Sequence, residues 1–174
     1  NMAKLWNLPV LYVCENNLYG IGTRIDRSTA VLDQYKRVSG YHIPSAQEDG
    51  QDVELVYKAA TRASKLVRSG KGPYFLELMT YRYRGHSMSD SNAYRGKDEE
   101  RMWSGRDPVI MLRDRLVEAG KLTPEQFKEM DTEILDEIED DVIRFATESP
   151  EPPVSEVEKY VLAENDPWVR GGVQ

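Results

Sequence analysis

The chain has 174 residues, of which 40% are apolar and 30% are charged, and this composition is typical of a globular protein with its own core. The net charge of -7 argues against nucleic acid as a partner, because phosphate binding requires a basic surface. No apolar run approaches the roughly 20 residues that cross a membrane, and the single cysteine, Cys14, excludes an internal disulfide. We therefore expect neither nucleic acid nor a membrane as a partner.

The first residues predict the end of a helix and then a strand. Because residues 1–6 carry no start signal, we expect the chain to begin inside a domain whose upstream half lies elsewhere. Residues 8–14 are apolar and rich in β-branched and aromatic side chains, which predicts a parallel strand buried on both faces, with Cys14 as a small core residue. Residues 15–22 contain two asparagines and two glycines and predict a loop at the carboxyl end of that strand, where ligands bind in open α/β sheets.

The next segment predicts a crossover between parallel strands. We expect a short helix within residues 28–41 and a longer one from Asp52 to Ser69, where apolar residues recur at helical spacing. Asp52 can cap the longer helix, and Gly70 follows where helices commonly end. Residues 73–81 predict a second strand, so the order strand, helix, strand implies a right-handed crossover. The polar residues 82–96 after this strand predict a long functional loop.

The remaining residues predict helices. Pro108 to Ala119 is typical of a helix with proline in its first turn. Thr123, Pro124 and Gln126 form a start signal for an acidic helix that continues to Thr147. One short helix is expected at residues 155–163 and an extended tail to Gln174.

These elements predict two domains. Residues 1–107 should form an α/β domain, a three-layer parallel sheet with helices on both faces, that includes the active-site loop at residues 82–96. Residues 108–174 should form a helical C-terminal extension.

The loop after the first strand offers oxygen ligands for a cation. Asn17 carries a neutral amide oxygen that suits a hard cation such as Mg²⁺, and the backbone carbonyl of Tyr19 lies two residues later. Gly20 and Gly22 allow the backbone to approach a ligand closely. The alternative is that Asn16 and Asn17 only build the turn through local hydrogen bonds.

The loop after the second strand carries three arginines, a histidine, serines and an aspartate. Histidine exchanges protons near neutral pH, and arginine binds carboxylates or phosphates in a fork. His86 and Ser87 are adjacent and so point apart, which disfavours a hydrolytic pair. The alternative for the whole loop is a charged surface without chemistry.

Taken together in this order, the segments resemble the alpha subunit of the decarboxylating component of the pyruvate dehydrogenase complex, a family of thiamine-diphosphate-dependent 2-oxo acid dehydrogenases. The most specific stretches are residues 8–23, 69–73, 77–90 and 147–153. The resemblance implies the C-terminal half of the thiamine-diphosphate-binding fold. It also implies an oxidoreductase that decarboxylates pyruvate and transfers the acyl group to a lipoyl carrier.

The resemblance also assigns residues. It implies that Asn17 and the carbonyl of Tyr19 bind the Mg²⁺ that holds the thiamine diphosphate, and that Gly20 lies close to this cofactor. His86 matches the active-site histidine that faces the cofactor and assists acyl transfer. Ser87 matches a serine that a kinase phosphorylates in mitochondrial members. The family's Gly-Asp-Gly, whose aspartate is a further Mg²⁺ ligand, is absent from this sequence, so we expect poor cofactor binding without an upstream half.

The implied partners are a beta subunit in a heterotetramer, which supplies the activating glutamate, a lipoyl-bearing acyltransferase and a small 2-oxo acid. The bacterial cytoplasm and the mitochondrial matrix both fit. Residues 91–95 depart from the pyruvate pattern and are more similar to branched-chain or acetoin relatives. A noncatalytic interaction module with the same fold is the alternative of another class.

Overall fold

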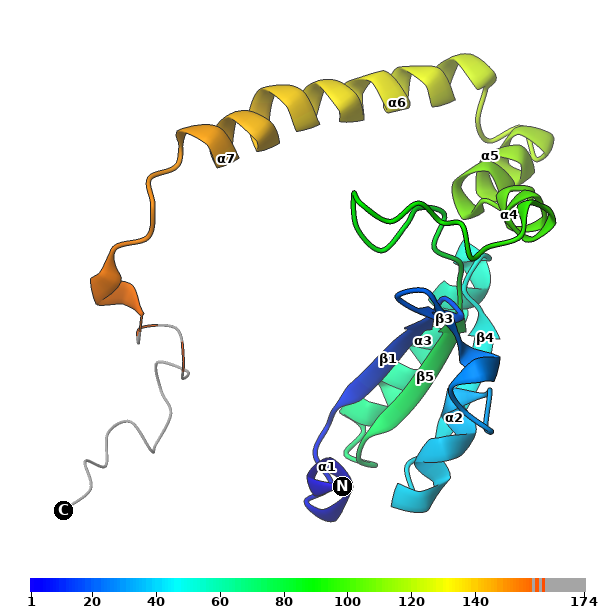
Figure 1. The fold of residues 1–174 in the computed structure, drawn as a ribbon, viewed down its shortest axis with the longest axis vertical. Helices are drawn as coiled ribbons and strands as arrows, with labels where there is room; N and C mark the ends of the chain where they lie inside the picture. The colour runs from blue at the N-terminus through cyan, green and yellow to red at the C-terminus, as the bar shows by residue number, and fades with distance from the viewer. Residues whose placement is uncertain (158, 160, 162–174) are drawn as a thin grey trace. The chain divides into compact units, whose positions relative to one another are not determined.

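The computed structural model describes residues 1–157, 159 and 161 (Figure 1). The chain divides into two compact units, with the boundary between Leu122 and Thr123. The domain division that the sequence suggests, between residues 107 and 108, stays a prediction. The expected extended tail lies outside the described residues, as do residues 158, 160, 162 and 163 of the expected helix at residues 155–163.

A three-stranded parallel sheet organises the first unit. The strands are β1 (Leu11–Asn16), β4 (Ser45–Asp49) and β5 (Tyr74–Met79), in the order β1-β5-β4 (Figure 1). Met79 is in register with Asn16 on one side and with Asp49 on the other. The carboxyl ends of the three strands therefore meet at one edge of the sheet.

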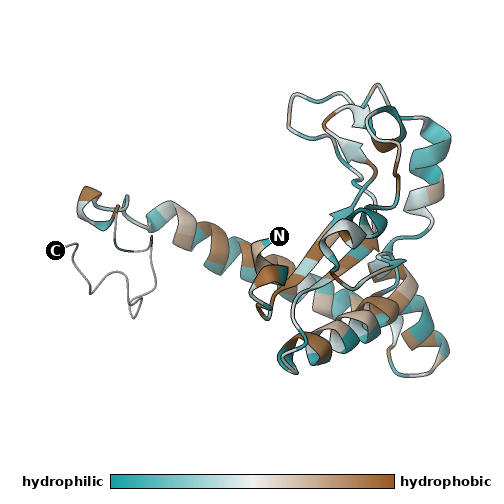
Figure 2. Cartoon of the chain, turned by 90° about the horizontal axis from the view of Figure 1, so that it is seen from below, coloured by the Kyte–Doolittle hydropathy of each residue, from teal (hydrophilic) through white to brown (hydrophobic). Residues whose placement is uncertain are grey.

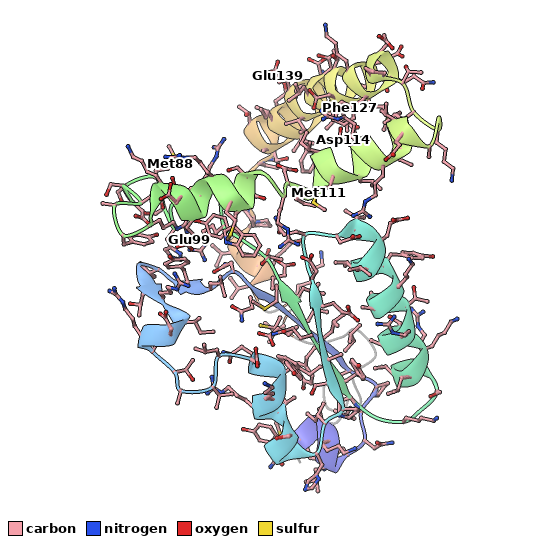
Figure 3. The ribbon with its side chains drawn as sticks, turned by 90° about the vertical axis from the view of Figure 1, so that its right-hand side faces the viewer. Met88, Glu99, Met111, Asp114, Phe127 and Glu139 are labelled. Atoms are coloured by element: carbon pink, nitrogen blue, oxygen red, sulfur yellow. The ribbon has the colours of Figure 1, made fainter. Side chains whose placement is uncertain are left out.

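Helices cover both faces of this sheet, as the sequence predicts. The helix α3 (Val53–Arg68) buries Ala59 against Leu76 and Leu78 of β5. On the opposite face, α2 (Gln34–Arg37) and the 3₁₀ helix η2 (Val38–Tyr41) follow the short η1 (Ile25–Arg27). Figure 3 shows α2 and α3 on opposite sides of the strands. The three-layer α/β architecture is confirmed.

Glu77 joins the sheet to α2. Its side chain is fully buried and accepts hydrogen bonds from the backbone N–H groups of Gln34 at 3.1 Å and Tyr35 at 2.9 Å, the first residues of α2. It also accepts from Asn16 Nδ2 in β1 at 2.6 Å and from Gln47 Nε2 in β4 at 3.1 Å. One carboxylate therefore connects all three strands and caps a helix.

The strand β1 differs from the expectation of burial on both faces. Tyr12 is 42% and Val13 is 52% exposed, because β1 has a neighbour on one side only among the described residues. Cys14 is half-buried rather than a core residue, and burial raises the pKa of its thiol.

The remaining elements of the first unit surround the sheet. They are α1 (Met2–Leu5), the hairpin of β2 (Tyr19–Gly20) and β3 (Thr23–Arg24), α4 (Lys97–Ser104) and α5 (Pro108–Glu118). Asp52 caps α3 and also pairs with Arg115 of α5 at 2.6 Å, which fastens α5 to the start of α3. The hydrogen bond from Arg115 lowers the pKa of the Asp52 carboxyl to about 2.

The second unit begins with the predicted helix start. Thr123 and Gln126 form the reciprocal capping box of α6 (Pro124–Glu137). A π-helical segment, η3 (Ile138–Ile143), joins α6 to α7 (Arg144–Glu148), and a 3₁₀ turn, η4, spans Val154–Glu156. Apolar and polar residues alternate along this helix (Figure 2), and most apolar ones are exposed. Among the described residues, none of the helices has the length and apolar character that a membrane crossing needs.

Candidate functional site

Two loops leave the sheet at the edge where the strands end. The first follows Asn16, the last residue of β1, and begins with Asn17, and the second follows β5 and runs to α4. The backbone N–H of Thr80 donates to the carbonyl of Asn16 at 3.0 Å, so the two loops begin side by side. This edge is the ligand-binding position that parallel α/β sheets provide.

The two asparagines have different surroundings. Asn16 is 8% exposed, donates to Glu77 and accepts from the N–H of Leu18 at 3.1 Å, so it is a structural residue. Asn17 is partly buried, and its amide oxygen accepts from the N–H of Tyr19 at 3.1 Å. An amide oxygen has two lone pairs, so Asn17 builds the turn and still has one lone pair for a ligand.

The backbone of this first loop is strained. Leu18 has φ 70° and Ile21 has φ 55°, which is the left-handed region that bulky residues rarely adopt. Each such residue costs about 1–3 kcal/mol and persists only where its surroundings impose it, commonly at functional sites. Among the described residues, its two chain neighbours aside, no atom lies within 4 Å of the position that a Cβ would take on Gly20, so this glycine leaves open space beside the loop.

The second loop is closed on itself by Asp90. The carboxylate of Asp90 accepts from the His86 N–H at 2.8 Å, the Asn92 N–H at 3.0 Å and the Tyr94 hydroxyl at 2.7 Å. These hydrogen bonds, that from Tyr94 above all, lower the pKa of Asp90 to about 2. A Cβ on Gly85 would lie 2.6 Å from the Asp90 carbonyl oxygen, so only glycine permits this closure.

The ring of His86 is exposed and has a defined proton arrangement. Arg82 Nη1 lies 3.2 Å from His86 Nδ1. Because a guanidinium can only donate, Nδ1 must accept, and the neutral ring then carries its proton on Nε2. Among the described residues, the Ser87 hydroxyl beside it bonds only to that of Ser89, with 3.0 Å between the oxygens. Met88 at this loop is fully exposed (Figure 3).

Arg95 holds the base of the same loop, and the sequence alone does not single it out. Its side chain is 7% exposed, and Nη1 donates to the backbone carbonyl oxygens of Arg82 and Arg84. Its guanidinium lies 5.0 Å from the ring centre of Tyr19 and 5.5 Å from that of Tyr94. Such cation–π contacts stabilise a buried arginine, and no ion pair of Arg95 occurs among the described residues.

Tyr19 connects the two loops. Its ring packs against Tyr94 with 5.7 Å between centres, and its hydroxyl donates to both carboxylate oxygens of Glu99 at 3.1 Å. Burial and the bond to Glu99 raise the pKa of the Tyr19 hydroxyl. The structure thus brings the two sequence motifs to one edge, although His86 and Ser87 make no direct hydrogen bond to Asn17 among the described residues.

The donors fit a magnesium–diphosphate group in part. Asn17 Oδ1 and the Tyr19 carbonyl are neutral oxygen ligands, which suit Mg²⁺. Within residues 1–157, 159 and 161, no three His, Cys, Asp or Glu side chains group as a metal site would require. Two protein oxygens are fewer than octahedral Mg²⁺ needs, so a phosphate, water or further protein ligand must complete its coordination.

Comparisons with known proteins agree on one family. The family model described as "Dehydrogenase E1 component" matches residues 1–155. The chain is 45% identical over 177 residues to the human mitochondrial pyruvate dehydrogenase E1 component subunit alpha, somatic form, covering 100% of this chain and 45% of that protein. It is 46% identical to the mitochondrial subunit alpha of Sminthopsis macroura, covering 100% of this chain and 48% of that protein. The chain therefore spans less than half the length of these curated relatives.

Proposed function

Because the chain belongs to the dehydrogenase E1 component family, we propose that it is part of the alpha subunit of a 2-oxo acid dehydrogenase. The reaction is the oxidative decarboxylation of pyruvate with transfer of the acyl group to a lipoyl carrier. The observation that supports this best is the meeting of the strained asparagine loop and the His86 loop at the carboxyl edge of the sheet.

The proposed cofactors are thiamine diphosphate and Mg²⁺. Asn17 would bind the cation through its amide oxygen and Tyr19 through its backbone carbonyl. Gly20 would allow the diphosphate to approach, because the space beside it is open among the described residues. The bound cofactor supplies the electron sink that loss of the carboxyl group requires. The chain's own residues orient this group and hold the metal.

His86 is the proposed catalytic residue. Its Nδ1 accepts from Arg82 in the neutral ring, so the Nε2–H group would be free to donate a hydrogen bond to the reacting group during acyl transfer. The hydrogen bond from its backbone N–H to Asp90 fixes the ring's place on the loop. We expect His86→Ala to reduce acyl transfer to the carrier more than it reduces cofactor binding.

Ser87 is a proposed phosphorylation site. Its hydroxyl is exposed and bonds only to Ser89 among the described residues, so a kinase can reach it. A phosphate would add about -1.5 to -2 charges beside His86 and repel an anionic 2-oxo acid.

The proposed partners are the upstream half of the alpha subunit, a beta subunit in a heterotetramer and a lipoyl-bearing acyltransferase. The compartment would be the mitochondrial matrix or the bacterial cytoplasm. The curated relatives named above are mitochondrial proteins by their names.

Reconstitution tests the proposed function. The chain is produced within a full-length alpha subunit, assembled with a beta subunit, and given Mg²⁺, thiamine diphosphate and an electron-accepting dye. We expect turnover with pyruvate that disappears in Asn17→Ala. Turnover only with branched-chain 2-oxo acids or acetoin would show that pyruvate is not the substrate and would keep the rest of the proposal. An assembled, cofactor-loaded complex without turnover would contradict the proposed enzymatic function and favour a noncatalytic interaction module.

A further inference from the structure

Glu99 lies where the β2–β3 hairpin meets the segment that follows the His86 loop (Figure 3). Its carboxylate accepts from the Tyr19 hydroxyl at 3.1 Å and from Arg24 Nη1 at 3.4 Å. Tyr19 and Arg24 are cross-strand partners in the hairpin. A single carboxylate on α4 therefore holds both strands of the hairpin.

The position of Glu99 distinguishes it from its neighbour. The Glu99 side chain is 18% exposed, whereas that of Asp98, in the same first turn of α4, is 96% exposed. Within the part of the chain that the structure describes, Asp98 forms an ion pair only with Arg101 on its own helix, at 3.6 Å. Charge-assisted hydrogen bonds strengthen as water is excluded, so the contact of Glu99 with Tyr19 should be much stronger than the surface pair.

Tyr19 is held at both ends of its side chain. Its ring packs against Tyr94 and Arg95, and its hydroxyl is bound by Glu99. The residues on either side of β2, Leu18 and Ile21, have left-handed backbones that need external support. Fixing the Tyr19 side chain limits the rotation of its backbone and so the direction of its carbonyl.

The same contacts reach the second loop. Arg95, which packs on Tyr19, donates to the carbonyl oxygens of Arg82 and Arg84 on either side of Tyr83. Tyr94, which packs on Tyr19, donates to Asp90 and so to the closure that holds the His86 N–H. Movement of Tyr19 would therefore disturb both loops.

We propose that Glu99 is a positioning residue that acts through Tyr19: it holds the Tyr19 carbonyl in place for Mg²⁺ and the diphosphate, and it couples metal binding to the order of the His86 loop. This inference rests on the proposed function. Glu99 touches neither the metal nor the substrate. Its effect should appear in metal affinity and in loop protection, with little change in turnover at saturating Mg²⁺.

The test uses the assembled complex of full-length alpha and beta subunits. Mg²⁺ is titrated at fixed thiamine diphosphate, and binding is followed by intrinsic protein fluorescence. We expect Glu99→Ala to raise the apparent Kd for Mg²⁺ about tenfold, the effect of losing one strong charge-assisted bond. Glu99→Gln keeps an acceptor for the Tyr19 hydroxyl and should stay within about threefold of the unmodified protein. Asp98→Ala, the matched control, should leave the Kd unchanged.

Trypsin gives a second measurement that is independent of activity. Arg82 and Arg84 are cleavage sites within the His86 loop. In the unmodified complex, Mg²⁺ and thiamine diphosphate should slow cleavage there. Glu99→Ala should require about ten times more Mg²⁺ for the same protection. Tyr19→Phe removes one oxygen and keeps the ring, so it should shift both measurements in the same direction without unfolding the loop.

The outcomes separate the two levels of inference. An unmodified complex that binds no Mg²⁺–thiamine diphosphate would overturn both the proposed function and the role of Glu99. Normal binding together with a Glu99→Ala variant that matches Asp98→Ala in Kd and in protection would overturn the role of Glu99 alone. A loss of thermal stability in Glu99→Ala with unchanged Mg²⁺ affinity would also overturn it.

Discussion

Replacing Glu77 by glutamine should weaken the fold more than any other isosteric change in the sheet. The carboxylate is fully buried, and all four of its neighbours donate: Asn16, Gln34, Tyr35 and Gln47. Each carboxylate oxygen accepts from two of them. A glutamine keeps one accepting oxygen, and its NH₂ group would face two donors.

The expected loss follows from this geometry. Two hydrogen bonds to a charged acceptor disappear, and each contributes about 1.5–3 kcal/mol. Some relaxation of the short helix α2 will recover part of this, so we expect Glu77→Gln to lower the free energy of unfolding by about 3–5 kcal/mol. With an m value of about 2 kcal/mol per M, the urea midpoint should fall by about 2 M.

Urea unfolding of the alpha subunit, followed by circular dichroism, measures this loss. Glu48→Gln on β4 is the matched control, because Glu48 pairs with the exposed Arg62 at 2.6 Å and its loss should change stability by less than about 1 kcal/mol. A Glu77→Gln variant as stable as Glu48→Gln would refute the view that the four donors depend on a carboxylate.

Three further predictions concern the loops and the second unit. Gly72 has φ 87°, and a Cβ there would collide with Asn7 Oδ1, so Gly72→Ala should lower the free energy of unfolding, measured by thermal unfolding, by about 2 kcal/mol. Gly96 has open space around its missing Cβ, so Gly96→Ala should change this free energy little. The pKa of Asp90 is lowered from its ordinary 3.8 to about 2, so its contribution to loop order is complete above pH 3.8 and is lost as the pH falls toward 2. The amide resonance of His86 should follow this titration, and a midpoint at 3.8 or higher would contradict the assignment. Thr123→Ala removes the capping box of α6 and should cost about 1 kcal/mol and reduce helical ellipticity, while Thr123→Ser should keep both.

The sequence predicts those elements whose signals are local. Asp52 caps α3, and Thr123 with Gln126 caps α6, because each cap needs only residues two or three positions away. The strand β4 was not predicted, since Ser45 to Asp49 has no apolar alternation and forms through its pairing with β5. Such a segment becomes a strand because it pairs with residues that are distant in the sequence.

The same limit applies to the site. The rule for parallel sheets places Asn17 and the His86 loop at one edge, and the structure has both loops there. The roles of Glu77, Arg95 and Glu99 depend on neighbours 11 to 80 positions away, beyond the reach of a local sequence signal. Only the charged Glu77 within an otherwise apolar strand is a recognisable anomaly in the sequence.

The π-helical segment Ile138–Ile143 determines which way the end of the second unit's helix faces. A π turn contains one residue more than an α turn, so every side chain after it is rotated by about 100° relative to an unbroken α-helix. Met130 and Ile134 precede this step and Phe145 follows it, and all three are more than half exposed. The helix therefore presents exposed apolar side chains in two different directions. If the segment 138–143 were a regular α-helix of the same length, Phe145 would turn by about 100° onto the side of Met130 and Ile134, and all three side chains would face the same surface.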